Sequence, residues 1–486
     1  MTTRTSRSRR PGTGSDSLEF RGRQSFDSDP FSHILRPPPG ETEEERARRI
    51  HSLQEAQRIS REIDQSILES KKLYDQRKKA VKILLLGQSE SGKSTTLKNF
   101  KLAFAPAQFR SERAAWRTII QLNVIGSVKR LLDVLSDEFE YSSSSPPGSL
   151  GRTASSQSVP RPKVLTDEHR RIRMRLSPLL SVETSLSRKL FPDNVDRERV
   201  PELCVRAGGG WKTIVERATS PPGPSVKKGR SHRPGTSEGK NTDDPTNILA
   251  ACRDDIVSLW EDPAVQAVLS MRNVRLDQAP GFFLNDAGRI AVEDYDPTDS
   301  DIVRARLRTY GVEEHHLIME AGQTWYFYDV GGSRSMRPHW VPYFDDVQAI
   351  IFLAPLAFNQ VLEEDPQVNR LQDSIHLWQE VCANPLLSQS NLILFLNKMD
   401  ILAANLNAGI LVRKYVPSYG DAPNDVPHVT KYFKDKFHAY QKRLSPKPRP
   451  FFCHETSVVD TNATRAILVG VQEGILRSHL AKINVI

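Results

Sequence analysis

"GQSESGKS", residues 87–94, is the stretch that decides the fold of this 486-residue chain. It matches the pattern G-x-x-x-x-G-K-S, with the apolar run "VKILLL" before it and a helical pattern after it. A glycine-rich turn between a strand and a helix directs backbone N–H groups at phosphate oxygens. We expect Lys93 to reach the β- and γ-phosphates and Ser94 to bind Mg²⁺. A chance glycine-rich turn is a poor alternative, because the flanking strand and helix are both in place.

Two later motifs follow strand-like apolar runs. "DVGG", residues 329–332, places Asp329 where a carboxylate would hold Mg²⁺ through water and Gly332 where an N–H would meet the γ-phosphate. "NKMD", residues 397–400, ends in Asp400, which can accept paired hydrogen bonds from the N1–H and 2-amino group of guanine. Adenine has no such donor pair, so GTP is favoured over ATP. An ATP-using P-loop enzyme remains an alternative, since each short motif alone is weak.

Strand-like runs alternate with helical segments on both sides of a long helical stretch. This pattern predicts an α/β fold with a mostly parallel sheet, interrupted by an inserted all-α domain and preceded by a long N-terminal helix. The expected boundaries are a disordered basic tail at 1–42, an amphipathic helix at 43–80, the two parts of the α/β domain at 81–104 and 301–486, and the insertion at 105–300 with low-complexity loops near 141–162 and 219–246.

Composition and charge limit the compartment and the kinds of partner that we expect for this protein. The net charge of +9 comes partly from segments such as "RTSRSRRPG" near the N-terminus, which favour a solvated tail over a nucleic-acid-binding face. Four cysteines, at 204, 252, 382 and 453, form no CxxC pair and are expected to be free thiols of a reducing compartment. No apolar run approaches the roughly 18 residues of a membrane span. We therefore expect a cytoplasmic protein.

The ordered set of motifs resembles the α subunit of heterotrimeric G proteins, a Ras-like GTPase with an inserted helical domain, over roughly residues 43–486. "DIVRARLRTYGV" at 301–312 resembles the first switch of that family, and "YDVGGSRSMRPHW" at 328–340 the second. "HETSVVDT" at 454–461 resembles the guanine loop. "FFLNDAGRIAVEDYDPTDSD" at 282–301 resembles the end of the helical domain. The resemblance implies a GTPase that switches between GTP- and GDP-bound states.

The resemblance also assigns roles to individual positions. Arg306 corresponds to the arginine with which Gα proteins themselves neutralise transition-state charge, and Glu90 to an acid that pairs with it. Mg²⁺ would be held by Ser94, Thr309 and, through water, Asp329. The nucleotide-binding positions implied are Gly87, Glu90, Ser91, Gly92, Lys93, Ser94, Thr95, Val303, Arg304, Arg306, Thr309, Asp329, Gly331, Gly332, Asn397, Lys398, Asp400 and Val458, the last through its backbone N–H.

Two positions depart from the family pattern near the hydrolysis step. Ser333 stands where the family has the Gln that orients the attacking water, and Ser89 replaces a small glycine beside it. Because the polar atom of serine lies two bonds nearer the backbone, positioning worth roughly 10²–10⁴-fold in rate is expected to be lost. The catalytic set is then Arg306, Glu90 and Ser333. Slow hydrolysis is the expectation. A pseudo-GTPase scaffold and a tolerated substitution are the alternatives.

Partners follow from the same resemblance. The GDP-bound form would bind a βγ dimer through residues 43–79 and the second switch, and residues 462–482 would contact a G protein-coupled receptor. Arg337 has a possible partner in Asp373 that would lock the GTP form. Met336, Pro338 and His339 replace charged residues of the family, which weakens the expectation for βγ. Thr2 and the absence of an early cysteine remove the N-terminal lipid signals, so contact with the inner face of the plasma membrane would come through partners or the basic tail.

Overall fold

The computed structural model of the chain describes residues 40–143, 165–190, 204–206, 214–215, 245–272, 274–319 and 322–482. The chain forms two units, Met1–Lys79 and Ala80–Ile486. Most of the predicted basic tail and of the two low-complexity loops lies outside the described residues. Among the described helices, none combines the length and the apolar character that a bilayer span requires.

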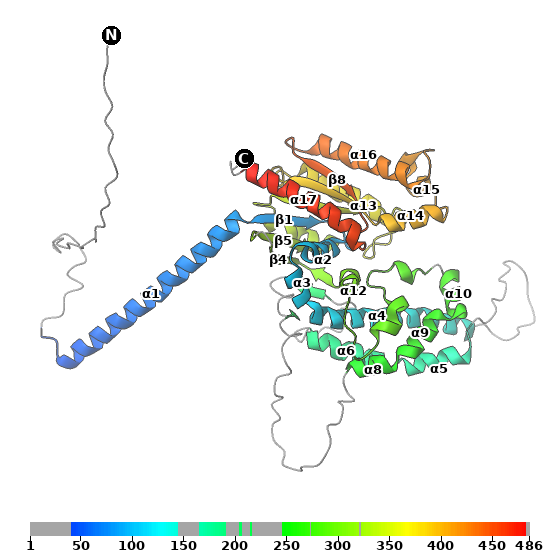
Figure 1. The fold of residues 1–486 in the computed structure, drawn as a ribbon, viewed down its shortest axis with the longest axis horizontal. Coiled ribbons are helices and arrows are strands. Elements are labelled where there is room, and N and C mark those ends of the chain that lie inside the picture. The colour runs from blue at the N-terminus through cyan, green and yellow to red at the C-terminus, as the bar shows by residue number, and fades with distance from the viewer. Residues whose placement is uncertain are drawn as a thin grey trace, which may run out of the picture. The chain divides into compact units, whose positions relative to one another are not determined.

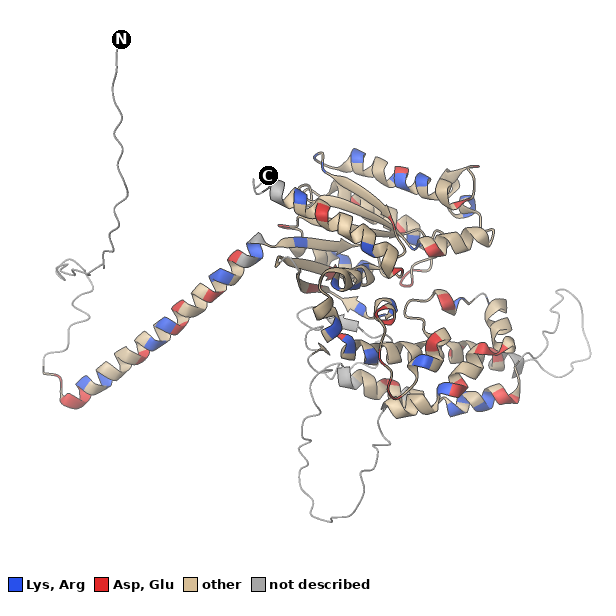
Figure 2. Ribbon diagram, in the orientation of Figure 1, with Lys and Arg blue, Asp and Glu red and all other residues tan. Residues whose placement is uncertain are grey.

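The described part of the first unit is dominated by one helix, α1 (Glu43–Lys79) (Figure 1). Its start is capped reciprocally, because the Thr42 N–H donates to Glu45 Oε2 at 3.0 Å and the Glu45 N–H donates to Thr42 Oγ1 at 3.4 Å. Acidic and basic side chains are interspersed along it (Figure 2), and Arg58 bonds both Glu55 and Glu62. Such pairs, three or four residues apart, support an exposed helix.

A six-stranded sheet carries the second unit, in the order β4-β5-β1-β6-β7-β8. Every neighbouring pair is parallel except β4 with β5. All residues of β1, β6 and β7 are buried, as continuous apolar runs in a parallel sheet require. The bounds are β1 Val81–Leu86, β4 Val312–Ile318, β5 Thr324–Val330, β6 Ala349–Pro355, β7 Asn391–Asn397 and β8 Phe451–Glu455.

Helices cover both faces of this sheet, and each face of the sheet has its own apolar core. On one face α13 and α16 bury Trp378, Phe433 and Phe437. On the other, α2 and α17 bury Phe100 and Leu468. The bounds are α2 Lys93–Phe104, α13 Arg370–Ala383, α14 Met399–Asn407, α15 Val412–Tyr415, α16 Val426–Leu444 and α17 Thr461–Lys482, with 3-10 segments η5 Arg334–Tyr343 and η6 Pro417–Tyr419. This arrangement places the ends of the parallel strands at one open edge.

Between α2 and β3, helices pack around the long helix α4 in a third core that includes Trp116, Ile119 and Ile120 (Figure 1). We call this part the helical region. Its elements are α3 Pro106–Ser111, α4 Arg113–Ser143, α5 Asp167–Arg175, α6 Leu179–Leu190, α8 Pro245–Ala251, α9 Arg253–Glu261, α10 Pro263–Met271, η3 Leu276–Gln278, η4 Leu284–Asp286, α11 Ala287–Ile290 and α12 Asp299–Arg304. The predicted fold class, a Ras-like domain with a helical insertion, is confirmed.

One element was not predicted. A short strand, β2 (Cys204–Arg206), lies within the insertion expected to be all-α and pairs with β3 (Arg308–Tyr310) in a separate two-stranded sheet. Three residues carry no hydrophobic period, so the sequence alone gave no basis for a strand there.

Candidate functional site

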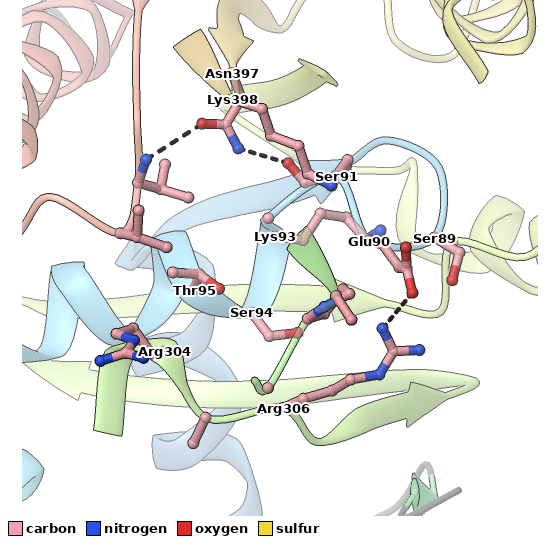
Figure 3. Close-up of a pocket in the computed structure, with 18 of the residues that line it drawn as sticks. Ser89, Glu90, Ser91, Lys93, Ser94, Thr95, Arg304, Arg306, Asn397 and Lys398 are labelled. Carbon is pink, nitrogen blue, oxygen red and sulfur yellow. Dashed lines mark hydrogen bonds and ion pairs between the residues drawn. The ribbon is translucent and has the colours of Figure 1, made fainter. Parts of the chain in front are cut away.

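A cavity of about 480 Å³ opens at the carboxyl ends of the parallel strands, where α/β sheets bind ligands. Segments far apart in the sequence meet in it: residues 89–95, 277–282, 304–309, 330–332, 397–404 and 457–459 all contribute lining side chains or backbone. Figure 3 shows Lys93, Ser94, Arg306 and Lys398 around this space. The predicted phosphate-binding and base-reading motifs therefore share one cavity.

The phosphate loop, residues 87–94, is shaped by close backbone approach. Gly92 has φ 103°, and a Cβ there would lie 2.5 Å from Asn397 Nδ2. The Lys93 ammonium donates to the carbonyls of Gly87 and Gln88, each at 2.8 Å. Burial lowers the pKa of Lys93 to about 8, so the ammonium lacks a sufficient counter-charge in the protein alone. A phosphate anion in the loop would supply it.

Three oxygen-bearing side chains converge beside the loop. Ser94 Oγ donates to Asp329 Oδ2 at 2.6 Å, and Thr309 Oγ1 donates to the same oxygen at 3.2 Å. Asp329 is 2% exposed, its Oδ1 has no hydrogen-bond partner, and burial raises the pKa of this carboxyl. Hydroxyl and carboxylate oxygens are the ligands that Mg²⁺ prefers. The donor set and the orphaned oxygen fit a divalent cation.

Two arginines share the carboxylate of Glu90. The Arg306 guanidinium donates to Glu90 Oε1, and Arg370 Nη2 donates to Oε2 at 3.1 Å (Figure 3 shows the first pair). Burial opposes ionisation of Glu90, but the two arginine charges outweigh it and hold the pKa at about 2. Asn123 fixes the Arg306 backbone by bonds to its N–H at 2.7 Å and its carbonyl at 3.0 Å. Arg306 thus lies at the cavity with its charge held by Glu90.

The opposite end of the cavity carries the residues that were predicted to read the base. Ser457 Oγ donates to Asp400 Oδ1 at 2.7 Å, which orients the carboxylate. Asn397 Nδ2 donates to the Ser91 carbonyl at 2.7 Å, while its Oδ1 accepts the Val458 N–H at 3.3 Å. Burial, followed by the charge of Arg370, lowers the pKa of Lys398 to about 8. Asn397 therefore ties the phosphate loop to the guanine loop.

The second switch, residues 328–340, rests directly on the phosphate loop. A Cβ at Gly332 would lie 2.3 Å from the backbone carbon of Gln88, so only glycine permits this contact. Arg337 Nη1 and Arg334 Nε donate to Asp373 Oδ1 at 3.2 and 3.3 Å. The expected Arg337–Asp373 pair is present, with Arg334 as a second donor.

Four of the predicted positions do not line the cavity. Gly87 contributes through its carbonyl to Lys93, and Asp329 through the Ser94 and Thr309 hydroxyls. Ser333 is half-buried, with its Oγ 3.4 Å from that of Ser335. The side chain of Val303 is fully buried in the core of the helical region, so a contact with nucleotide would have to come from its backbone, and its role stays a prediction.

Arg304 lines the cavity, but its guanidinium is already engaged. It donates to Asp286 Oδ2 at 3.0 Å and to the Phe282 carbonyl at 3.1 Å. These bonds brace residues 277–282, a wall of the cavity that sequence reasoning missed. The Pro280-Gly281 pair signals a turn, but nothing local indicates that the turn faces a ligand.

Comparison with known proteins agrees with this geometry. The G-protein alpha subunit family model matches residues 57–475. The chain is 30% identical to the guanine nucleotide-binding protein alpha-4 subunit of Mycosarcoma maydis, over 93% of this chain and 95% of that protein. It is 26% identical to the alpha-2 subunit of Neurospora crassa, over 87% and 95%, and 33% identical to the G(o) subunit alpha of Locusta migratoria, over 48% and 64%. With a matching phosphate loop, switch glycine and base-reading aspartate in one cavity, the chain belongs to the G-protein alpha subunit family.

Proposed function

We propose that this chain is a signal-transducing GTPase that binds GTP and GDP in the cavity with Mg²⁺. One observation carries the proposal: the phosphate loop, the convergent Ser94, Thr309 and Asp329 oxygens, and the base-reading Asp400 open into or border one cavity. Lys93 and the loop N–H groups bind the phosphates, and Asp400 selects guanine. Ser94, Thr309 and Asp329 would hold Mg²⁺, which would neutralise negative charge on the bound phosphates.

Arg306 neutralises the negative charge that develops on the phosphoryl group during hydrolysis. In the structure its guanidinium is bonded to Glu90, within the cavity lining. Rotation about its side-chain torsions moves that charge from the carboxylate to the transferring phosphoryl group. In this proposal the Gly332 backbone, packed on Gln88, meets the γ-phosphate with its N–H and so reports the presence of that phosphate to the second switch.

Hydrolysis is slow in this proposal because Ser333 stands at the position that orients the attacking water. Its hydroxyl lies outside the cavity lining and next to Ser335. The test is single-turnover GTP hydrolysis by the natural protein and by Ser333→Gln, with GTP affinity measured in parallel. Ser333→Gln should be about 10²-fold faster or more at similar affinity. Ser335→Gln, which adds the same side chain two residues away, is the matched control. Equal rates for all three proteins would refute the proposed cause.

A scaffold that binds GTP without turnover is the second candidate. The placement of Ser333 favours it, whereas the retained Arg306–Glu90 pair and the Thr309–Asp329 bond favour a working site. No phosphate release from the natural protein after one day, with normal GTP binding and rescue by Ser333→Gln, would establish the scaffold function.

The proposed partners are a βγ dimer for the GDP-bound form and a G protein-coupled receptor. Helix α1 supports the first, since Ile50, Leu53 and Ile63 are exposed along it at helical spacing. Helix α17 would contact the receptor. Retention of the full chain on immobilised βγ in GDP, and release with a non-hydrolysable GTP analogue, is the expected result. No retention in GDP would exclude the dimer as a partner.

A further inference from the structure

The unpredicted strand β2 lies against the strand that carries Thr309. The two strands are parallel, with Cys204 opposite Arg308, Val205 opposite Thr309 and Arg206 opposite Tyr310. They form a sheet separate from the six-stranded one. An insertion in the helical region therefore contributes backbone to the first switch, at the very residue whose hydroxyl bonds Asp329.

Strand β3 is short, and Asn123 fixes the backbone of Arg306 just before it. It spans Arg308–Tyr310, with Tyr310 54% exposed. Just beyond its end, the Gly331 N–H donates to the Gly311 carbonyl at 2.7 Å, which fixes the exit from the strand. Such a short segment is marginal as an isolated strand, and backbone pairing with β2 restricts the residues before that fixed point.

Described residues that precede and follow β2 in the sequence are packed in the core of the helical region. Helix α6, which precedes β2, buries Val182 and Leu186 in the core of the helical region. After β2, Ile214 is 2% exposed in the same core. Because β2 lies between these two anchors, its pairing with β3 links the first switch to the packed helices.

We propose that β2 is a positioning segment of the GTPase site, whose pairing with β3 holds Thr309 toward Asp329 and Ser94. This inference rests on the proposed function. Both strands belong to one chain, so the pairing is intramolecular and favoured by a high effective concentration. In other GTPases the γ-phosphate and Mg²⁺ order this switch. Here Thr309 is held at the metal position before the γ-phosphate arrives and after it leaves.

The first experiment measures release of a fluorescent, non-hydrolysable GTP analogue from the full chain at increasing free Mg²⁺. Adjacent residues of a strand direct their N–H groups to opposite sides, so either Val205→Pro or Arg206→Pro removes a donor that faces β3. The proline variant that removes this donor should need about 10-fold more Mg²⁺ for half-maximal retention of the analogue. Losses of about this size occur when groups that orient metal ligands are removed. Val205→Thr keeps the N–H and should match the natural protein.

Release in EDTA separates positioning from general structure. Without Mg²⁺ the contact between Thr309 and the metal contributes nothing to binding. The proline variant that lacks the donor facing β3 should therefore release the analogue at the same rate as the natural protein. Loosening of the helical region would instead speed release equally with and without Mg²⁺, and that outcome would overturn the proposal. Identical Mg²⁺ dependence in all variants would overturn it as well. If the natural protein shows no saturable nucleotide binding, the proposed function itself fails.

A cross-link tests the register directly. Arg308→Cys places a second thiol at the position opposite Cys204. A short bis-maleimide, each of whose two rings adds one cysteine thiol across its double bond, should join the two cysteines in both the GDP and the GTP-analogue states, and a peptide digest would identify the linked pair. Glu314→Cys, on the exposed side of β4, is the matched control and should not react with Cys204. Equal yields from the two variants would show that β2 does not pair with the switch.

Discussion

Replacement of Arg370 is the substitution whose effect follows most directly from the structure. Its side chain is 4% exposed and does not line the nucleotide cavity. Nη1 donates to the Ser89 carbonyl at 3.0 Å and Nη2 to Glu90 Oε2 at 3.1 Å. Arg370→Met keeps an unbranched apolar stem but removes the charged guanidinium and both of its bonds. The variant therefore tests the support of the phosphate loop without touching the ligand.

The size of the effect follows from Glu90. Lowering its pKa from 4.5 to about 2 corresponds to about 3 kcal/mol in favour of the folded, ionised state. Burial works against this, so the arginines together contribute more. Removing one partner of a buried pair typically costs 3–5 kcal/mol, and here Arg306 remains on the same carboxylate. We expect Arg370→Met to lower the free energy of unfolding by about 3 kcal/mol at neutral pH.

The direction of the Glu90 pKa shift determines how the free energy of unfolding depends on pH. The folded-state pKa of Glu90 is depressed, so its stabilisation is complete above 4.5 and is lost as pH falls toward 2. With one arginine gone the depression is smaller. The difference in unfolding free energy between the natural protein and Arg370→Met should therefore be constant above about pH 5 and shrink below it.

Urea unfolding of both proteins, at fixed GDP and Mg²⁺ and at several pH values, measures this difference. Arg413→Met is the matched control, because Arg413 forms a single ion pair with Asp421 and is 57% exposed. It should cost no more than about 1 kcal/mol. The reasoning is refuted if Arg370→Met costs no more than Arg413→Met, or if its cost stays the same down to about pH 3.5.

Three further outcomes follow from the site. Asp400→Asn removes the acceptor of two charge-assisted bonds worth about 1.5–3 kcal/mol each. In competition binding the affinity for GTP should therefore fall about 100-fold or more, while the affinity for xanthosine triphosphate rises. Unchanged base preference would contradict the role assigned to Asp400. Burial places the pKa of Lys93 at about 8, and a bound phosphate would raise it. The affinity for GTP should therefore be full below about pH 8 and fall above it. Calorimetry at about pH 8.5 should show proton uptake on binding, and Lys93→Met should abolish this uptake. Gly332→Ala would put a Cβ 2.3 Å from Gln88 and should erase the preference for a GTP analogue over GDP, whereas Gly470→Ala, with open space around it, should not.

The sequence predicted those parts of the site whose chemistry depends on local backbone shape. A phosphate loop needs glycine at fixed spacing between a strand and a helix, and Gly92 with its φ of 103° shows why. Asp329 lies near the carboxyl end of β5 and Asp400 follows β7, so the parallel sheet brings them to one edge. These motifs could be located without knowing how distant segments pack.

Tertiary contacts could not be predicted in the same way. The wall at 277–282 faces the cavity because the helical region packs beside α2, and a turn signal carries no information about that packing. Val303 shows the opposite case. It precedes Arg304, which lines the cavity, but the helical turn of α12 directs the Val303 side chain into the core. Arg370, which begins α13, belongs to no motif of the phosphate loop that it supports.

In the proposed mechanism, the two arginines on the Glu90 carboxylate also change what hydrolysis would require of Arg306. If Glu90 had Arg306 as its single partner, moving that arginine to a phosphate would leave a buried carboxylate uncompensated, at a cost of several kcal/mol. Arg370 stays bonded to Oε2 and to the Ser89 carbonyl when Arg306 departs, so Glu90 keeps an opposite charge and the loop keeps its shape. Arg370 therefore lowers the cost of releasing Arg306. The stability of the resting site and the availability of its catalytic charge are set by the same residue.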